Sequence, residues 1–271
     1  MKTRAEDATY AFANAREVQR ERLALLALLL DEGTFRLLDR LGVRPGWRCL
    51  EVGAGGGSVA AWLCERVGPG GSVLATDLDT TVLVDHEQPR LEVREHDLLR
   101  DELPEAEFDL VYARLLLAWL PRPELGLRRM LAALRPGGCA LLEEMDFVSV
   151  APDPRLDRES RVVFERVVEA HNAVLAESHS FDPFYGRRLA GEVASAGLVE
   201  AGCEGRASIW QGGEAGGRVW RLTLLQLRDR LVASGLVTAA DVDRALELLE
   251  ERRLRFLSQI TVAAWGCRPG G

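Results

Sequence analysis

Residues 50–58 read LEVGAGGGS and connect an apolar run to a segment with helical spacing. Glycine at positions 53 and 55 permits the backbone angles of a tight turn and leaves room for a ligand to approach the main chain. The helix that follows presents unpaired N–H groups and the positive end of its dipole to that ligand. This stretch therefore predicts a strand, a ligand-binding turn and a helix.

The chemistry of this turn favours one kind of ligand over another. A dinucleotide-binding turn carries a third glycine, which falls on Ser58 here. The carboxylate of Glu51, two residues before Gly53, would repel a pyrophosphate. A ligand with an ammonium group and no phosphate is attracted instead, and the methionine portion of S-adenosylmethionine is such a ligand.

Short apolar runs alternate with helical segments from this turn onward. The predicted strands cover 48–52, 72–76, 91–94, 109–112 and 139–143, and the predicted helices cover 58–67 and 122–134. This alternation is typical of a parallel, doubly wound sheet with helices on both faces and a ligand at the carboxyl ends of the strands. The sequence therefore predicts an α/β fold.

The segments outside this alternation are mostly helical in pattern. Residues 5–41 predict two helices separated at Gly33, and further helices are predicted at 157–177, 189–196, 218–233 and 239–254. Strands are predicted at 199–210 and 260–265, and the glycine pairs 212–213 and 216–217 predict a flexible joint. We expect a single domain over 1–271, made of N-terminal helices (1–45), a cofactor-binding core (46–150), a helical cap formed by two insertions (151–181 and 212–255) and a closing strand (256–271).

Composition restricts the partners of the chain. The 271 residues carry a formal net charge of −8, which disfavours nucleic acid because a phosphate backbone attracts basic surfaces. The five cysteines form no CxxC pair, so we expect free buried thiols in a reducing cytoplasm, with no disulfide and no metal. The longest apolar run, Leu23 to Leu30, is far shorter than the roughly 20 residues that span a bilayer. We therefore expect a soluble, cytoplasmic protein with no membrane partner.

Two more acidic residues follow predicted strands. Asp77 comes directly after the strand 72–76, where a carboxylate accepts hydrogen bonds from ribose hydroxyls. The run HDL at 96–98, which contains Asp97, follows the next strand and is placed for the edge of an adenine. Because the carboxyl ends of parallel strands meet at one edge of the sheet, we expect these acids and Glu51 to belong to one ligand site.

The run from Glu51 to Asp146 resembles a class I S-adenosylmethionine-dependent methyltransferase, in particular the bacterial enzymes that methylate small molecules in natural-product pathways. The motifs that carry the resemblance are the ExGxGxG turn, the acids at 77 and 97, FDLV at 108–111 and LRPGG at 134–138. The resemblance implies a Rossmann-like sheet of seven strands whose last strand is antiparallel, with S-adenosylmethionine as the cofactor.

The resemblance also implies which residues hold that cofactor. The methionine end would be lined by Glu51, Gly53, Ala54 and Gly55, the ribose by Asp77 and Leu78, and the adenine by Asp97 and Leu98. Arg114 follows the fourth strand, where the family contacts the cofactor or the acceptor; an ordinary surface or helix-capping arginine is the alternative.

One departure from the family narrows the acceptor. Relatives that methylate adenine or glutamine amides carry Asn/Asp-Pro-Pro-Tyr/Phe after the fourth strand, whereas residues 112–116 read YARLL. This difference disfavours nucleic-acid bases and protein glutamine as acceptors. We expect methyl transfer to an O, N or C atom of a small molecule, in secondary metabolism.

The need for a general base depends on the acceptor, because a hydroxyl benefits from one and a neutral amine does not. The candidates are His179, in a predicted loop over the strand ends, and His171, on the predicted helix 157–177. Each is also explained as an exposed or capping histidine. We interpret His86 and His96 as structural.

Three acids end the fifth strand, and we expect Glu143, Glu144 and Asp146 to face the acceptor. One interpretation is a magnesium site that orients a catechol-like diol, because hard cations prefer oxygen ligands. A second is a carboxylate that holds a polar or cationic acceptor group, and a third is a solvated strand terminus.

Other functions are compatible with the same pattern. The fold and cofactor also serve a non-methylating cyclisation or rearrangement. A non-catalytic subunit would use the leucines of the cap helices as a dimer or partner face, namely those at 222, 224, 225, 227, 246, 248 and 249. An NAD-dependent oxidoreductase is a more distant alternative. The aromatic residues Phe181, Phe184, Tyr185, Trp210 and Trp220 either line an acceptor pocket or fill the core of the cap. The sequence is also compatible with a homodimer.

Overall fold

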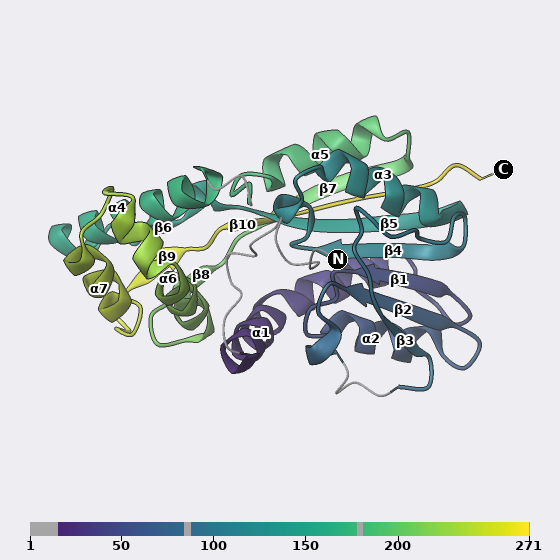
Figure 1. Ribbon diagram of the computed structural model, residues 1–271, viewed down its shortest axis with the longest axis horizontal. Helices are drawn as coiled ribbons and strands as arrows, with labels where there is room; N and C mark the ends of the chain where they lie inside the picture. Colours follow the sequence, from purple (N-terminus) through teal and green to yellow (C-terminus); the bar gives the residue numbers. More distant parts are fainter. Residues whose placement is uncertain (1–15, 84–87, 178–180, 271) are drawn as a thin grey trace, which may run out of the picture. The chain divides into compact units, whose positions relative to one another are not determined.

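The computed structural model describes residues 16–83, 88–177 and 181–270 (Figure 1). The chain divides into two compact units, which we call the core unit and the helical unit. The core unit comprises Leu30–Met145, Tyr185–Gly205 and Thr261–Gly271, and the helical unit comprises Met1–Leu29, Asp146–Phe184 and Arg206–Ile260. The two segments predicted to form a cap, 151–181 and 212–255, lie in the helical unit. The predicted single domain and its internal boundaries stay a prediction.

The core unit is built on a seven-stranded sheet with the strand order β3-β2-β1-β4-β5-β10-β7. Its strands are β1 (Arg48–Val52), β2 (Ser72–Asp77), β3 (Leu91–Glu95), β4 (Phe108–Arg114), β5 (Leu134–Asp146), β7 (Val199–Arg206) and β10 (Ile260–Cys267). The sheet is mixed, and the last strand of the chain, β10, is antiparallel. The predicted α/β, Rossmann-like fold class is confirmed.

The first five strands lie in a register that brings their carboxyl ends to one edge. Val52 pairs with Thr76 of β2 and with Ala113 of β4, and the next residue of β4, Arg114, pairs with Glu143 of β5. All these pairs are parallel. Residues that follow β1, β2 and β4 therefore emerge at the same edge of the sheet.

Helices cover both faces of the sheet. The chain passes from β1 to β2 through α2 (Ser58–Val67) and from β4 to β5 through α3 (Pro123–Ala133), in opposite directions along the sheet. Since such crossovers are right-handed, the two helices lie on opposite faces. Leucines 37 and 38 of α1 (Arg16–Arg40) share the buried cluster of α2 with Trp265 of β10. A further helix, α5 (Gly186–Ser195), precedes β7.

The predicted break at Gly33 is wrong, because α1 continues through this residue. A glycine inside a helix costs about 1 kcal/mol relative to alanine, which contacts elsewhere along the helix readily offset. The neighbouring Thr34 is completely buried and hydrogen-bonded. The helix is therefore held by tertiary contacts and not by local propensity.

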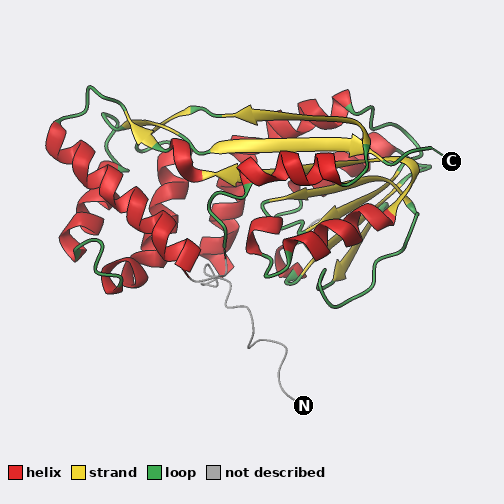
Figure 2. Cartoon of the chain, turned by 90° about the horizontal axis from the view of Figure 1, so that it is seen from above, coloured by secondary structure: helices red, strands yellow, loops and turns green. Residues whose placement is uncertain are grey.

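The helical unit contains α4 (Arg158–Glu177), α6 (Ala215–Ala233) and α7 (Ala239–Leu248), which pack against one another. Figure 2 shows these helices as a red group beside short yellow strands. A capping box begins α7: Thr238 Oγ1 accepts a hydrogen bond from Asp241 N at 3.1 Å, and the Asp241 side chain accepts one from Thr238 N at 2.9 Å.

Two predicted elements of this region are wrong in their extent. The strand expected at 199–210 is two strands, β7 and β8 (Ile209–Gln211), which belong to different sheets. The helix expected at 239–254 ends at Leu248, and β9 (Arg255–Leu257) follows it. β9 pairs antiparallel with β8 and with the two-residue β6, Ala151–Pro152. Two strand pairings between segments far apart in sequence thus replace the elements that local patterns predict.

The glycine pairs expected to form a flexible joint are close-packed instead. Gly216 and Gly217 lie in the first turn of α6, where a Cβ on Gly216 would overlap the ring of Trp210. A Cβ on Gly217 would lie 2.8 Å from the carbonyl oxygen of Gln211. These glycines allow α6 to approach β8 closely.

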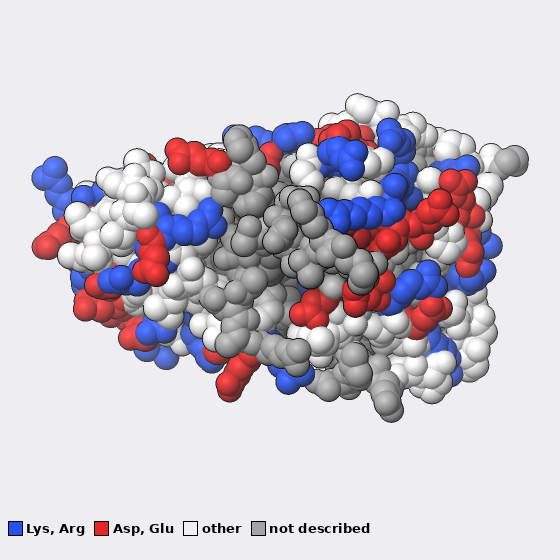
Figure 3. Space-filling model, in the orientation of Figure 1, with Lys and Arg blue, Asp and Glu red and all other residues white. Residues whose placement is uncertain are grey.

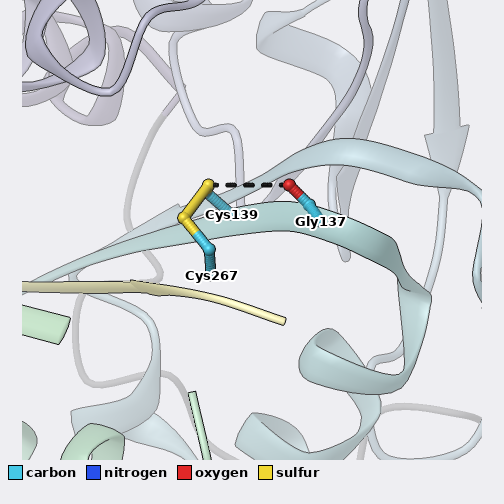
Figure 4. Close-up of a disulfide and its surroundings, with 3 residues drawn as sticks. All are labelled: Gly137, Cys139 and Cys267. Atoms are coloured by element: carbon cyan, nitrogen blue, oxygen red, sulfur yellow. Dashed lines mark hydrogen bonds between the residues drawn. A yellow bond between two sulfur atoms is a disulfide. The ribbon is translucent and has the colours of Figure 1, made fainter. Parts of the chain in front are cut away.

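The cysteines do not all match the prediction. Cys139 of β5 and Cys267 of β10 form a disulfide whose Cα atoms are 3.9 Å apart (Figure 4). Cys49 and Cys64 are free and buried as expected, whereas Cys203 is free but exposed. The expectation of five buried thiols is therefore wrong, and the cysteine pattern no longer supports a reducing compartment.

Candidate functional site

The glycine turn after β1 is anchored on β2. Gly53 N and Ala54 N both donate hydrogen bonds to the carbonyl oxygen of Thr76, at 2.8 and 3.0 Å. Gly53 and Gly55 have φ values of +72° and +54°, a region in which a Cβ is strained. The turn therefore needs its glycines, and it delivers the chain to the first residue of α2.

Glu51 lies beneath this turn with its side chain buried. Its Oε2 atom has no hydrogen-bond partner among the described residues. Burial raises the pKa of this carboxyl group to about 8; the positive charge of Arg114 lowers the pKa and the negative charge of Asp31 raises it. A buried acid with an unpartnered oxygen is costly unless a ligand supplies the missing donor or charge.

Arg114 links β4 to the helix before the sheet. Its guanidinium donates to Asp31 Oδ1 at 2.9 Å and to Thr34 Oγ1 at 3.1 Å. Burial alone would lower the pKa of Arg114, but nearby acidic groups, among them Glu143 and Asp31, raise it, so the group stays charged. The interpretation of Arg114 as an ordinary surface arginine is wrong. Sequence reasoning missed Asp31 and Thr34, which carry no motif and lie some 80 residues away.

Glu143 completes this buried network. Its Oε2 atom accepts a hydrogen bond from Thr34 Oγ1 at 2.5 Å and one from Tyr112 Oη at 3.0 Å. The side chain is completely buried, and burial raises the pKa of the Tyr112 phenol well above its ordinary value. Tyr112 is therefore neutral and acts as a donor to the carboxylate.

Asp77 ends β2 beside the glycine turn. Its Oδ2 atom accepts a hydrogen bond from Gly55 N at 2.8 Å, and its Oδ1 atom accepts one from Asp79 N at 3.2 Å. Burial raises the pKa of the Asp77 carboxyl group, and these N–H groups oppose the shift. The next residue, Leu78, is 67% exposed, which gives an uncovered apolar side chain next to the acid.

The run 96–98 follows β3 on the same edge of the sheet. Asp97 Oδ1 accepts a hydrogen bond from Leu99 N at 2.9 Å, so this carboxylate also organises its own turn. Leu98 is buried, and its Cδ2 atom would lie 3.2 Å from a Cβ on Gly126 of α3. His96 is buried, and burial lowers the pKa of its ring, which agrees with a neutral, structural histidine.

The acids at the end of β5 do not form a cluster. Side chains alternate along a strand, so Glu143 and Glu144 point to opposite faces of the sheet. Glu144 Oε1 accepts hydrogen bonds from Leu116 N and Leu117 N, and Asp146 Oδ1 accepts one from Val148 N at 3.0 Å. Within residues 16–83, 88–177 and 181–270, no group of three His, Cys, Asp or Glu side chains is placed to hold a metal ion. The expected converging cluster is not observed, and the described residues give no support to the magnesium interpretation.

His171 lies inside the helical unit. It is 1% exposed, and burial lowers the pKa of its ring to about 4. The ring packs against Trp220 at 4.9 Å and Phe147 at 5.3 Å between centroids, and Nδ1 lies 3.0 Å from Asn172 Oδ1. This histidine is neutral at physiological pH. His179 and His86 lie outside the described residues.

Most apolar residues expected to line a pocket or a partner face are core residues of their own units. Trp210 packs against Phe256 at 6.1 Å between ring centroids, and Trp220 Nε1 donates to Gln259 Oε1 at 3.2 Å. Leucines 224, 227, 246, 248 and 249 are all buried. Of the other leucines that the prediction named, Leu222 is half-buried and Leu225 is 41% exposed. The observed burial gives little support to a large leucine-rich partner face.

The surface carries charges of both signs. Figure 3 shows acidic and basic side chains intermixed over the described part of one face. Many are paired, as are Arg228 with Asp243 and Arg94 with Glu92. Among the described residues, no helix has the length and apolar character needed to cross a bilayer.

Comparisons with known proteins agree with this geometry. Residues 50–142 match the family model of the methyltransferase domain. A search of curated proteins returned no match. The fold is similar to that of the [4+2]-cyclase SpnF, with 15% identity, 89% of this chain and 81% of that chain covered, and a TM-score of 0.52.

Two further structures are similar. A proposed methyltransferase from Bacillus halodurans is 17% identical, with 88% of this chain and 99% of that chain covered and a TM-score of 0.53. A phosphoethanolamine N-methyltransferase from Haemonchus contortus, solved with S-adenosylmethionine, is 16% identical, with 88% and 52% covered and a TM-score of 0.51. Identities this low establish a shared fold alone. The family model identifies residues 50–142 as a methyltransferase domain, and the solved structures share its class I fold; the predicted family, enzyme class and S-adenosylmethionine cofactor agree with both.

Proposed function

We propose that this protein transfers the methyl group of S-adenosylmethionine to an O, N or C atom of a small-molecule metabolite, in secondary metabolism. The observation that carries the proposal is the buried carboxylate of Glu51, whose Oε2 atom lacks a partner among the described residues. Glu51 precedes by two residues a turn whose glycines adopt positive φ values. An ammonium group supplies both the charge and the donors that this oxygen lacks.

Each part of S-adenosylmethionine has its own candidate residues. We propose that Glu51, Gly53, Ala54 and Gly55 hold its methionine end, Asp77 and Leu78 its ribose, and Asp97 and Leu98 its adenine. Arg114 would act mainly through Glu51, because its guanidinium is already bonded to Asp31 and Thr34. When bound, the cofactor supplies a reactive methyl group on a sulfonium. The protein then has to align the acceptor and exclude water, which can contribute about 7–11 kcal/mol.

A hydroxyl acceptor loses a proton during methyl transfer, and a general base must accept it. We propose His171 and His179 as the candidate bases, with His171 in the neutral form that accepts a proton because burial lowers its pKa to about 4. Such a low pKa makes His171 a weak base, suited to an acidic phenol and poorly suited to an alcohol. An amine acceptor would need neither histidine, so the activity of His171→Asn distinguishes these acceptors.

The acidic character of the chain and the YARLL sequence after β4 support a small molecule over nucleic acid as the acceptor. The sequence is also compatible with a homodimer, which gel filtration with light scattering tests. A cytoplasmic location remains part of the proposal.

The test of methyl transfer is incubation with S-adenosylmethionine and a panel of small phenols, amines and carbon acids. Mass spectrometry should find S-adenosylhomocysteine together with an acceptor product heavier by one methylene. The likeness to SpnF motivates one alternative, a cyclisation or rearrangement in the same fold. A product with unchanged mass, formed without S-adenosylhomocysteine, would support that alternative and contradict methyl transfer.

A further inference from the structure

The turn after β4 has an unusual backbone. Leu115 has a φ of +57°, which lies in the left-handed region and is unfavourable for a residue with a Cβ. Its N–H still donates to the carbonyl oxygen of Glu143 at 2.8 Å, so the residue belongs to the ordered edge of the sheet. A conformation of this kind persists only where the surroundings hold it in place.

Glu144 provides that hold. Its Oε1 atom accepts hydrogen bonds from Leu116 N at 2.9 Å and from Leu117 N at 2.6 Å. These amides begin the short 3₁₀ helix Leu117–Trp119, whose N-cap residue makes no side-chain cap. The Glu144 side chain is 2% exposed, and charge-assisted bonds in such surroundings are strong. One carboxylate thus fixes two consecutive amides after the strained residue.

The fixed turn places Leu116 over the glycine turn. An ideal Cβ on Gly53 would lie 3.1 Å from Leu116 Cδ1. The side chain of Leu116 therefore occupies the space next to the first glycine of the cofactor turn. A continuous series of contacts runs from the Glu144 carboxylate through the Leu116 amide and side chain to Gly53.

We propose that Glu144 is a positioning residue for the cofactor: by holding the turn after β4, it sets Leu116 against Gly53 and so fixes the shape of the turn that receives the methionine end. The carboxylate acts through these residues and contacts neither cofactor nor acceptor. The inference rests on the proposed function, in that the turn from Glu51 to Gly57 must hold S-adenosylmethionine.

The experiment measures the affinity for S-adenosylhomocysteine by calorimetry in Glu144→Ala, Glu144→Gln and a control, Asp146→Ala. We expect Glu144→Ala to weaken binding by about tenfold or more, since two buried amides lose a charged acceptor. Glu144→Gln keeps the accepting oxygen and should stay within about threefold of the wild type. Asp146 ends the same strand and is also buried, but it holds a different turn, so Asp146→Ala should bind as the wild type does.

Amide hydrogen exchange gives a second readout, because the Leu116 and Leu117 amides should exchange faster in Glu144→Ala only. Should that variant fail to fold, Leu116→Ala replaces it, as it keeps both amide bonds and removes the contact over Gly53; it should weaken binding in the same direction. Wild-type affinity in a folded Glu144→Ala, wild-type affinity in Leu116→Ala, or an equal loss in Asp146→Ala would overturn the inference. Absence of binding in the wild type would instead contradict the proposed function itself.

Discussion

Replacing Glu51 by glutamine should stabilise the unliganded protein. Burial raises the pKa of Glu51 from its ordinary value of 4.5 to about 8, so the folded state keeps a proton that the unfolded state releases. The contribution of the protonated group to stability is complete below pH 4.5 and is lost as the pH rises through 8. At pH 7 the loss amounts to about 3 kcal/mol, taking about 1.4 kcal/mol for each unit between 4.5 and 7. Glutamine is neutral at every pH and avoids this loss.

The same substitution should weaken the cofactor. An ammonium group pairs with ionised Glu51, so below pH 8 the wild type must release a proton when it binds. Between pH 7.5 and 6 the affinity for S-adenosylhomocysteine should fall by nearly tenfold per pH unit. Glu51→Gln should bind more weakly and without this pH dependence. 5′-Methylthioadenosine lacks the amino-acid portion, so its affinity should be nearly independent of pH in both proteins.

Two measurements test this reasoning. Calorimetric unfolding at pH 5 and pH 7 should show Glu51→Gln more stable than the wild type at pH 7 and close to it at pH 5. Binding calorimetry in buffers of different ionisation enthalpy should show release of nearly one proton at pH 7. A less stable Glu51→Gln at pH 7, or a wild-type affinity that does not change with pH, would refute the assigned state of this carboxyl group.

Three other predictions concern separate parts of the core unit. Asp77→Ala should weaken S-adenosylhomocysteine binding by roughly 1–3 kcal/mol in calorimetry, because the acid that meets the ribose and holds the glycine turn is lost; unchanged affinity would show that the ribose lies elsewhere. Gly53→Ala should lower the free energy of unfolding by about 1–2 kcal/mol, because Gly53 has a positive φ, and should also weaken S-adenosylhomocysteine binding. Gly137 has a similar φ and open space around it, so Gly137→Ala should lower the free energy of unfolding by a similar amount and leave binding unchanged. Thiol titration of the denatured protein should count three thiols without reductant and five with it, because Cys139 and Cys267 are joined, and reduction should lower stability by about 2–4 kcal/mol; five thiols without reductant would exclude the disulfide.

The central strands could be predicted because strands buried on both faces appear in the sequence as short apolar runs between glycine and proline turns. The burial of Cys49 to Val52 and of Val73 to Thr76 agrees with this pattern. Elements stabilised by distant partners could not be predicted in the same way. β9 exists because Phe256 pairs with Trp210 and Pro152, and no local feature of 255–257 distinguishes it from the end of a helix.

The residues of the candidate site also differ in how far the sequence predicts their roles. Glu51 and Asp77 could be predicted because each lies at a strand end that the sequence indicates. The parallel register of β1 and β2 then brings the two strand ends to the same edge of the sheet. The sequence marks Glu144 as an acid at a strand end but does not reveal its role, because residue spacing does not determine which amides a carboxylate accepts hydrogen bonds from. Its partners at 116 and 117 belong to a turn whose left-handed residue, Leu115, carries no glycine or asparagine signal.

The helix before the sheet shows why the distant residues matter for chemistry. Three buried or half-buried carboxylates, those of Glu51, Asp31 and Glu143, surround one guanidinium, that of Arg114. Arg114 donates its hydrogen bonds to Asp31 and Thr34, so its charge reaches Glu51 through space and not through a bond. When Glu51 releases its proton, the new negative charge adds to that of Asp31, and the Glu51 Oε2 atom has no hydrogen-bond partner among the described residues. A cationic ligand relieves both the charge and the missing hydrogen bond, which is why α1, although it precedes the fold's first strand, belongs to the electrostatics of the cofactor site.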